Sequence, residues 1–501
     1  MPAPCRFWIL AALWVAAHAE AATPVAQVLH ADGLTLDGRL DEAAWGRAPL
    51  QATLTERKPA LRAVPAVATS FRVVLQDGAL WFGVECGDQD AEVTGRTLAR
   101  DSFALFSDDA LSVKLDAFLD RRTTLGFATN PLGAKLDYSA VEDGKFRVEV
   151  DFVWDVAVVR TKSGWTAEMR IPLTSLGLDP SAPPNAIGLN ITRDHAKRNA
   201  TYDWALMPAP YSPTAASLYG TLTGLASPAG GTERQGPVSV ALIPFTTLGL
   251  SGGDEALERT GNLGMDLKLG AGAALHATLT TNTDFAQADV DDRVVNLDRF
   301  GLFLPEKRDF FLSDVEVFEI GRREVTQPLY TRRFGLAGGA PVPILAGAKV
   351  ASRFDNGLRL GLLEVTTRPE GDTPWTSALA ARLEYVGTES ANWSVGTLVT
   401  HRQGERADDF NVVYGLDAGY RGPAPWLVEL SAWASQTGAG APDPETATGG
   451  TDTADAGSDT PAPAVVLKVL HRGELIRPWL DYAFLHPGFR ADLGFVRRSD
   501  V

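Results

Sequence analysis

The strongest local concentration of charge in the chain lies at 306–309, between aromatic side chains. The charged residues are Glu306, Lys307, Arg308 and Asp309. Phe303 precedes them, and Phe310 and Phe311 follow. Charges this dense beside aromatic rings are costly to bury unless they pair with one another. We therefore predict that the four residues form a paired structural cluster within a tied-down segment over 280–312, and the alternative is a solvated surface loop.

Motifs for catalysis and metal binding are sparse. The chain has no G-x-S-x-G pattern, no H-E-x-x-H pattern and no phosphate-binding glycine loop. The seven histidines show no ligand spacing, and the adjacency of Asp194 and His195 does not make a catalytic dyad. Among the 62 acidic residues no pair stands out for glycoside hydrolysis. The sequence therefore assigns no catalytic residue, no metal ligand and no cofactor.

Charge and the N-terminal segment bear on partners and location. The net charge of −16 makes nucleic acid a poor partner, and none is predicted. Arg6 and an apolar run over 7–17 precede small-residue cleavage sites, which predicts an export signal over 1–21. After cleavage Cys86 is the remaining cysteine, and its strand pattern predicts a buried structural thiol.

Residues 24–226 have the pattern of one all-β domain. Strands are predicted at 71–76, 80–86, 110–116, 123–129, 146–153, 165–171 and 186–193. Short strands separated by Asp-Gly, Asn-Pro and Pro-Pro breaks are typical of a β-sandwich. The small, polar segment 227–236 then predicts a linker.

Residues 237–501 predict an antiparallel β-barrel of the outer-membrane type. Strands are predicted at 238–249, 262–270, 273–281, 342–353, 357–367, 377–386, 392–402, 410–421, 425–435, 465–472, 475–485 and 489–496. Lengths near ten residues suit tilted strands that cross an outer membrane. Alternation is clear in 411–420, where Tyr414 and Leu416 face one way and Asn411 and Asp417 the other. The alternative is a second soluble sandwich, and the strand count predicts a barrel that is small, partial or truncated.

Three further features fit this barrel. Aromatic side chains for interfacial girdles are Trp375, Tyr385, Trp393, Tyr420 and Trp426. A polar interior would satisfy the charges at 306–309, and the strand residues available as partners are Lys268, Arg359, Arg382, Glu384 and Asp417. The segment 436–463 carries five acids and no base, which predicts a disordered loop that faces outward.

The stretch 280–312 also resembles the signature of a bacterial outer-membrane family known as the domain of unknown function number 5916. The matching residues include Asp284, Phe285, Gln287, Asp291, the run 294–297, Phe300, Phe303, the run 305–308 and the run 310–312. Thr283 stands where the family has proline, and Ser313 where it has an acid. The resemblance implies export to the outer membrane, and it implies no activity because the role of the family is not known.

The segment 24–226 resembles a family 9 carbohydrate-binding module. The matching pieces are LDGRLDEAAW at 36–45, LWFGVECGDQD at 80–90, SDDALSVKLD at 107–116 and GWTAEMRIPLTSLGL at 164–178. The resemblance implies a sugar site with stacked tryptophans and polar hydrogen-bonding groups. The ligand-binding candidates are Trp154, Trp204, Asp108, Asp109, Arg121, Arg122 and Asn130. Turn capping by the two aspartates and a hairpin salt bridge by the two arginines are the alternatives.

Two functions follow as expectations. The first is a non-enzymatic outer-membrane protein whose periplasmic N-terminal domain binds glycan or another polar ligand, with outer-membrane lipid as its other partner. The second is a carbohydrate-active hydrolase of O-glycosyl bonds, or its accessory subunit, in polysaccharide catabolism. The resemblance also implies calcium as a conceivable ligand, and the acidic residues available for it are Asp88, Asp90, Asp108 and Asp116. A structural plug or docking role for the sandwich is a third, lesser expectation.

Overall fold

A computed structural model describes the chain from residue 23 to residue 496 with gaps. The described residues are 23–52, 54–88, 93–141, 145–208, 211–226, 238–252, 257–271, 275–283, 303, 306–322, 325–337, 340–354, 356–369, 374–387, 393–421, 425–440, 460–473 and 476–496. The predicted signal 1–21, the linker 227–236 and the acids between 284 and 292 lie outside them, as does most of the predicted loop 436–463.

The N-terminal region is a sandwich of two sheets, which confirms the predicted fold class. The larger sheet contains β1 (Val25–Gln27), β3 (Thr55–Lys58), β6 (Ala110–Asp116), β7 (Thr123–Thr129), β8 (Lys135–Val141), β9 (Lys145–Arg147), β12 (Ala186–His195), β13 (Ala200–Asp203) and β14 (Gly220–Thr223). The smaller sheet contains β2 (Leu29–His30), β4 (Thr69–Gln76), β5 (Ala79–Gly87), β10 (Asp155–Thr161) and β11 (Gly164–Pro172). The short helical elements are α1 (Ala43–Arg47), η1 (Phe103–Ser107), η2 (Leu173–Leu176), η3 (Ala196–Arg198) and η4 (Ala216–Leu218).

The inward faces of the two sheets make one apolar core. Phe82 and Met169 from the smaller sheet belong to the same buried cluster as Val113 and Ile191 from the larger sheet. The predicted burial of Cys86 is confirmed, because its side chain is a free thiol in this core. Burial raises the pKa of the Cys86 thiol to about 11, which keeps the thiol protonated and unreactive.

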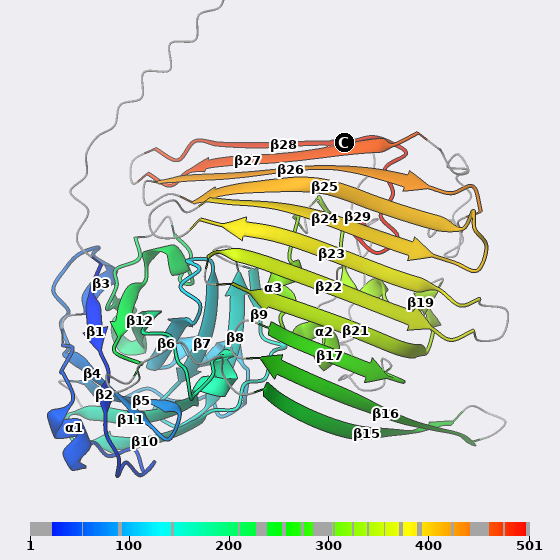
Figure 1. Ribbon diagram of the computed structural model, residues 1–501. Helices are drawn as coiled ribbons and strands as arrows, with labels where there is room; N and C mark the ends of the chain where they lie inside the picture. The colour runs from blue at the N-terminus through cyan, green and yellow to red at the C-terminus, as the bar shows by residue number, and fades with distance from the viewer. Residues whose placement is uncertain are drawn as a thin grey trace, which may run out of the picture.

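The C-terminal region is one continuous antiparallel sheet of eleven strands (Figure 1). Its strands in order are β15 (Val238–Gly252), β16 (Leu257–Ala271), β17 (Leu275–Thr281), β21 (Ile344–Arg353), β22 (Leu358–Thr367), β23 (Ser377–Val386), β24 (Trp393–Gln403), β25 (Phe410–Arg421), β26 (Trp426–Thr437), β27 (Ala462–His471) and β28 (Trp479–Leu485). β15 and β28 end this order, and closure into the predicted barrel is not seen among the described strands. None of the helices described here has the length and apolar composition needed to span a bilayer.

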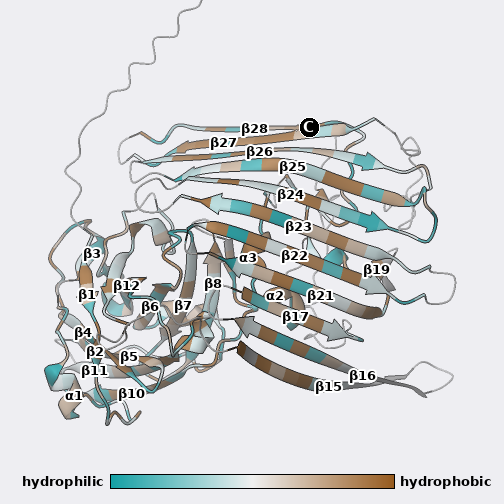
Figure 2. Ribbon diagram, in the orientation of Figure 1, coloured by the Kyte–Doolittle hydropathy of each residue, from teal (hydrophilic) through white to brown (hydrophobic). Residues whose placement is uncertain are grey.

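The two faces of this sheet differ in the way that the alternation predicts. In β25 the side chains of Tyr414, Leu416 and Tyr420 are exposed, whereas Asn411 and Val413 are buried. Figure 2 shows the resulting mixture of hydrophobic and hydrophilic residues along these strands. The outward face is therefore largely apolar, and the covered face carries charged as well as apolar side chains.

Two short helices cover part of the inner face. They are α2 (Asp309–Leu312) and α3 (Val315–Phe318), and they pack against β21 and β22. Gly361 in β22 permits this approach, because a Cβ atom there would lie 2.7 Å from the ring of Phe318. The remaining elements are β18 (Thr326–Gln327), η6 (Thr331–Arg333), β19 (Leu336–Ala337), β20 (Ala340–Pro341) and β29 (Phe495–Val496). β29 pairs with β18 rather than extending the large sheet as predicted.

Of the four charges predicted to form a paired cluster at 306–309, Arg308 and Glu306 pair with each other in the structure. Arg308 is buried and pairs with Glu306 at 2.8 Å, and it also donates to the carbonyls of Thr331 and Phe334. Arg308 lowers the pKa of the Glu306 carboxyl, although burial alone would raise it. Asp309 is exposed at the start of α2, so it is not a buried member of this cluster.

Replacing Arg308 should destabilise the protein far more than replacing an arginine on the surface. Arg308→Ala leaves Glu306 buried without its partner, which costs roughly 3–5 kcal/mol. Arg406→Ala is the matched control, because Arg406 pairs with Asp408 on an exposed connection. Urea denaturation of the purified variants measures the difference in unfolding free energy. Equal unfolding free energies for the two variants would show that Arg308 does not anchor the 306–308 segment.

Candidate functional site

A polar cleft of about 680 Å³ opens at one end of the sandwich. Four segments line it: residues 93–96 after β5, Ser107 in η1, residues 160–161 at the end of β10, and residues 196–197 in η3. Because β10 and β12 belong to different sheets, the cleft lies where the loops of both sheets meet. Its volume is within the range of small-ligand sites in proteins.

Asp109 ties two walls of this cleft together from behind. Its carboxylate accepts hydrogen bonds from the amide of Thr94 at 2.6 Å and from the amide of Ala196 at 2.9 Å. Its own amide donates to the Thr94 carbonyl at 2.9 Å. Asp109 is fully buried, so the predicted ligand-binding candidate positions the cleft rather than facing its interior.

Asp108 and Asn130 brace the neighbouring wall in the same manner. The Asp108 carboxylate accepts from the amides of Arg96 and Thr97 at 3.0 and 2.9 Å, and from the Asn130 side-chain amide at 2.9 Å. Burial would raise the pKa of Asp108, but these three donors hold it below its ordinary value. Asn130 also donates to the Thr97 carbonyl at 2.8 Å. A buried carboxylate therefore fixes the backbone from which Arg96 projects.

His195 is buried at the end of β12, directly before the cleft residues Ala196 and Lys197 in the chain. Its ring nitrogens lie 3.4 Å from Asp88 and 3.6 Å from Asp109, in a fully buried position. Burial lowers the pKa of His195, while the carboxylate of Asp109 opposes this shift. Asp194, the neighbour of His195 in the sequence, accepts a hydrogen bond from Thr201. The spatial grouping of His195 with Asp88 and Asp109 was not foreseen.

The structure corrects the assignment of Trp154 and Trp204 as sugar-stacking platforms. Trp154 is 1% exposed, packs edge-on against Phe127 at 5.6 Å and donates its indole N–H to Asp137. Trp204 is 4% exposed and packs edge-on against Phe71. Both rings belong to the sandwich core, so neither offers a face to a ligand. A sequence pattern cannot distinguish these two environments, because a tryptophan at a strand end suits either one.

Cationic side chains dominate the open rim of the cleft. Arg96, Arg160 and Lys197 are exposed and come from three different segments of its lining. The Arg160 Nε donates to the Pro131 carbonyl at 3.3 Å. Its guanidinium also lies against Gly95, where a Cβ atom would approach the Nη2 atom to 2.9 Å. None of these three cations was predicted as a site residue, although Arg160 lies near the end of β10 and Lys197 lies in η3.

Metal binding has no supporting geometry in the described part of the chain. No group of three or more His, Cys, Asp or Glu residues there could hold a metal ion. Of the acids considered for calcium, Asp88 contacts His195, Asp108 binds backbone amides and Asp116 binds the amides of Asp120 and Arg121. Asp90 lies outside the described residues.

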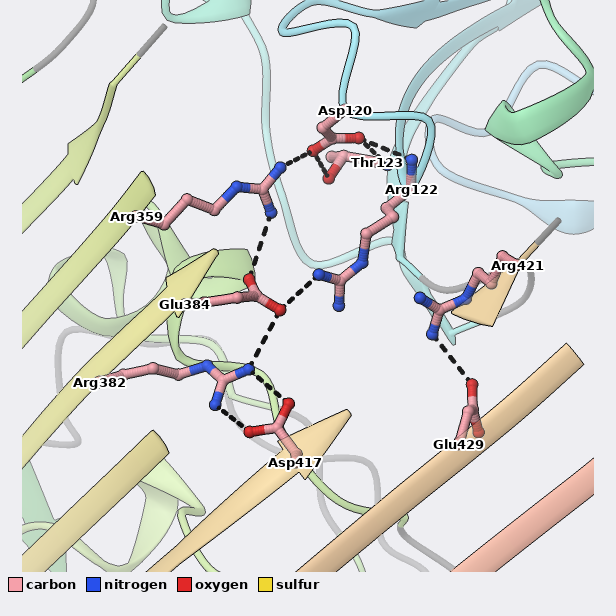
Figure 3. A network of polar contacts seen from close by, with 9 residues as sticks. All are labelled: Asp120, Arg122, Thr123, Arg359, Arg382, Glu384, Asp417, Arg421 and Glu429. Carbon is pink, nitrogen blue, oxygen red and sulfur yellow. Dashed lines mark hydrogen bonds and ion pairs between the residues drawn. The ribbon is translucent and has the colours of Figure 1, made fainter. Parts of the chain in front are cut away.

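Arg122 joins the sandwich to the large sheet instead of facing the cleft. Its guanidinium contacts Glu384 in β23 at 2.5 Å, and both side chains are buried (Figure 3). Arg359 in β22 contacts Asp120 at 2.7 Å and Glu384 at 3.6 Å. Arg382 contacts Glu384 at 3.2 Å and binds both oxygens of Asp417, at 2.7 and 3.0 Å. A continuous buried ion network therefore crosses from one domain to the other.

The hairpin between β6 and β7 presents the sandwich side of this network. Asp120 accepts from the amides of Arg122 and Thr123 and from the Thr123 hydroxyl, each at 2.7 Å. Burial would raise the pKa of Asp120, but Arg359 and the Thr123 hydrogen bonds lower it to about 2. Arg121 donates to the Tyr219 carbonyl at 2.8 Å, within the sandwich. The predicted ligand candidates Arg121 and Arg122 therefore have structural partners.

The interface uses other contacts beside this network. Arg147 in β9 forms an ion pair with Glu319, just after α3. The Arg353 guanidinium in β21 lies 4.7 Å from the centre of the Phe118 ring, which is on the β6–β7 connection. We predicted from the sequence that four residues of the network face inward and that their partners are the charges at 306–309. The residues are Arg359, Arg382, Glu384 and Asp417. The sequence did not indicate that the β6–β7 hairpin would occupy this position, because nothing local links 120–122 to strands more than 200 residues away.

Comparison with known proteins finds similarity for parts of the chain. Residues 236–370 match the family model described as "Domain of unknown function (DUF5916)", which confirms the resemblance of that segment. A family 9 carbohydrate-binding module from Caldicellulosiruptor kristjanssonii, solved with glucose, is similar over 40% of this chain and 95% of that one, with 17% identity and a TM-score of 0.30. A putative carbohydrate-binding protein from Bacteroides uniformis is similar over 40% of this chain and 99% of that one, with 12% identity and a TM-score of 0.33. No curated protein matches the sequence.

A double-mutant cycle on Arg122 and Glu384 should reveal strong coupling across the interface. Arg122→Ala, Glu384→Ala and the double variant should give a coupling energy of about 1.5 kcal/mol or more, because both groups are buried. Native-state proteolysis would measure the free energy of opening the interface. The same cycle on Arg406 and Asp408, an exposed pair, should give no coupling. No coupling in either cycle would contradict a docked interface.

Proposed function

We propose that this protein is a ligand-binding protein of the outer membrane, with a glycan or a comparable polar ligand held in the cleft of its sandwich. The sheet would lie in the membrane, and the sandwich would be in the periplasm at one end of its strands. The observation that carries the binding role is the polar cleft built from four chain segments and braced by Asp108 and Asp109.

The chemistry of the cleft supports binding more than hydrolysis. Its described lining offers the hydroxyls of Thr94, Ser107 and Thr161 and the cationic groups of Arg96 and Arg160. Hydroxyl and guanidinium groups suit the many oxygens of a sugar. None of the described lining residues is a carboxylate, whereas glycoside hydrolysis by the common route needs a pair of them. Rigid bracing by buried carboxylates also suits recognition, because less ordering is required when the ligand binds.

A purified preparation of the full chain should bind soluble oligosaccharides through this cleft. Isothermal titration against a panel of plant and bacterial oligosaccharides would measure affinity, and chromatography of the same mixtures would detect released sugar. Asp109→Ala should weaken binding by about tenfold or more, because it frees two walls of the cleft at once. Ser70→Ala is a control outside the described cleft lining, because Ser70 donates to the exposed Glu85 at 3.3 Å. Absence of binding across the panel would overturn the proposed role.

The polarity of the large sheet supports its proposed place in a membrane. Large apolar side chains are exposed in adjacent strands, among them Leu383, Val395 and Leu416. Tyr385, Trp393, Tyr420 and Trp426 are exposed near the strand ends beside the sandwich. Buried Arg359, Arg382 and Glu384 face the other side. An outer wall that is apolar with aromatic residues at its margin, around a polar inner side, is typical of outer-membrane strands.

An arginine on the outward face should impair membrane assembly. Leu416→Arg places a charge on a β25 position that is 62% exposed and would face lipid, which costs about 2–4 kcal/mol near the bilayer centre. Leu98→Arg is the control, because Leu98 is 72% exposed on the sandwich. Folding into lipid vesicles, followed by urea titration, would show the difference. Equal behaviour of both variants, with native protein recovered without detergent, would exclude the membrane location.

A further inference from the structure

We propose that the cleft selects anionic sugars, which carry carboxylate or sulfate groups, over neutral ones. This inference rests on the ligand-binding function proposed above and narrows its ligand class. It follows from the positions of Arg96 and Arg160, whose side chains line the same cleft from different segments.

Arg160 is held in place before any ligand arrives. Its Nε is engaged with the Pro131 carbonyl at 3.3 Å, and its guanidinium rests against Gly95. The lack of a side chain at Gly95 leaves room for that guanidinium, because a Cβ atom would come within 2.9 Å of its Nη2 atom. A preplaced guanidinium loses less conformational freedom when it binds an anion than a mobile one does. Its planar donors also match the two oxygens of a carboxylate or sulfate.

Arg96 provides a second cation on a wall that is equally well anchored. The amides of Arg96 and Thr97 are both fixed by the buried carboxylate of Asp108. Within the described part of the chain, no carboxylate pairs with the guanidinium of Arg96 or Arg160. The buried carboxylates of Asp108 and Asp109 contact this lining through its backbone, because they accept hydrogen bonds from the amides of Arg96, Thr94 and Ala196.

The surroundings add positive charge to the same region. Lys197 lines the cleft, and the exposed residues Lys162 and Arg198 are next to lining residues in the sequence. The charged residues of the described lining are all cations, whereas the whole chain carries a net charge of −16. Neutral sugars gain little from such charges, whereas an anionic sugar gains charge-assisted hydrogen bonds and electrostatic attraction.

Matched sugars can test this selectivity on the full-length protein. The probes are trigalacturonate, its methyl ester, neutral galactotriose and a sulfated galactose trisaccharide, titrated by calorimetry at low and high salt. We expect at least one anionic sugar to bind about tenfold or more tightly than its neutral counterpart, with the difference reduced by salt. Comparison of trigalacturonate with the sulfated sugar distinguishes carboxylate from sulfate as the preferred group.

Variants connect the preference to the two arginines. Arg96→Ala and Arg160→Ala should each reduce anionic-sugar binding by about tenfold, and Gly95→Ala should weaken it by displacing the Arg160 guanidinium. Arg406→Ala, on an exposed connection of the large sheet, should leave binding unchanged. Equal affinity for anionic and neutral sugars, unaffected by these variants, would overturn the anionic preference and leave sugar binding intact. Failure of every sugar to bind would instead overturn the proposed function itself.

Discussion

The structure depends on how Glu384 is neutralised between the two domains. Three guanidiniums, from Arg122, Arg359 and Arg382, converge on this one carboxylate. Asp120 and Asp417 supply the two further anions, so three positive and three negative groups balance. Such a buried set contributes little net stability when intact, but removing one member leaves a charge without compensation. The network therefore favours a single docked arrangement of sandwich and sheet over alternatives that would separate these groups.

The need to neutralise Glu384 explains why charged residues on these strands face the sandwich. A sheet in a soluble protein usually buries its apolar face and exposes its polar one. Here Leu383 and Leu416 are exposed, while Arg382 and Glu384 are buried on the face that the sandwich hairpin contacts. The inward charges require partners of opposite sign at fixed positions, and the β6–β7 hairpin provides two of them in Asp120 and Arg122. Docking thus specifies which face of the sheet is covered.

Much of the fold could be predicted because alternation is a local signal. Strands β6, β7, β23 and β25 have the predicted bounds, and most others differ by only a few residues. The prediction of a strand at 146–153 was wrong after Arg147, because the carboxylate of Asp137 instead accepts from the Phe152 amide and the Trp154 indole. The prediction at 489–496 extended the large sheet, yet only 495–496 pair, and with β18. Both errors come from tertiary partners that no local pattern encodes.

In the candidate site, too, the sequence indicated which residues are polar but did not indicate what each of them does. Sequence reasoning identified Asp108, Asp109 and Asn130, and all three lie behind the cleft. Their carboxylates and amide are buried and turned toward backbone groups, so they shape the site while Arg96 and Arg160 reach its open side. An isolated aspartate in a turn is equally suited to binding a ligand or to capping amides, and only the fold decides between these roles. The buried acids fix the backbone of the cleft walls, and the exposed arginines on those walls present the positive charge on which the proposed ligand preference rests. The cleft therefore has two layers of polar residues: the buried acids hold the backbone of its walls, and the exposed residues present the groups that a ligand would meet.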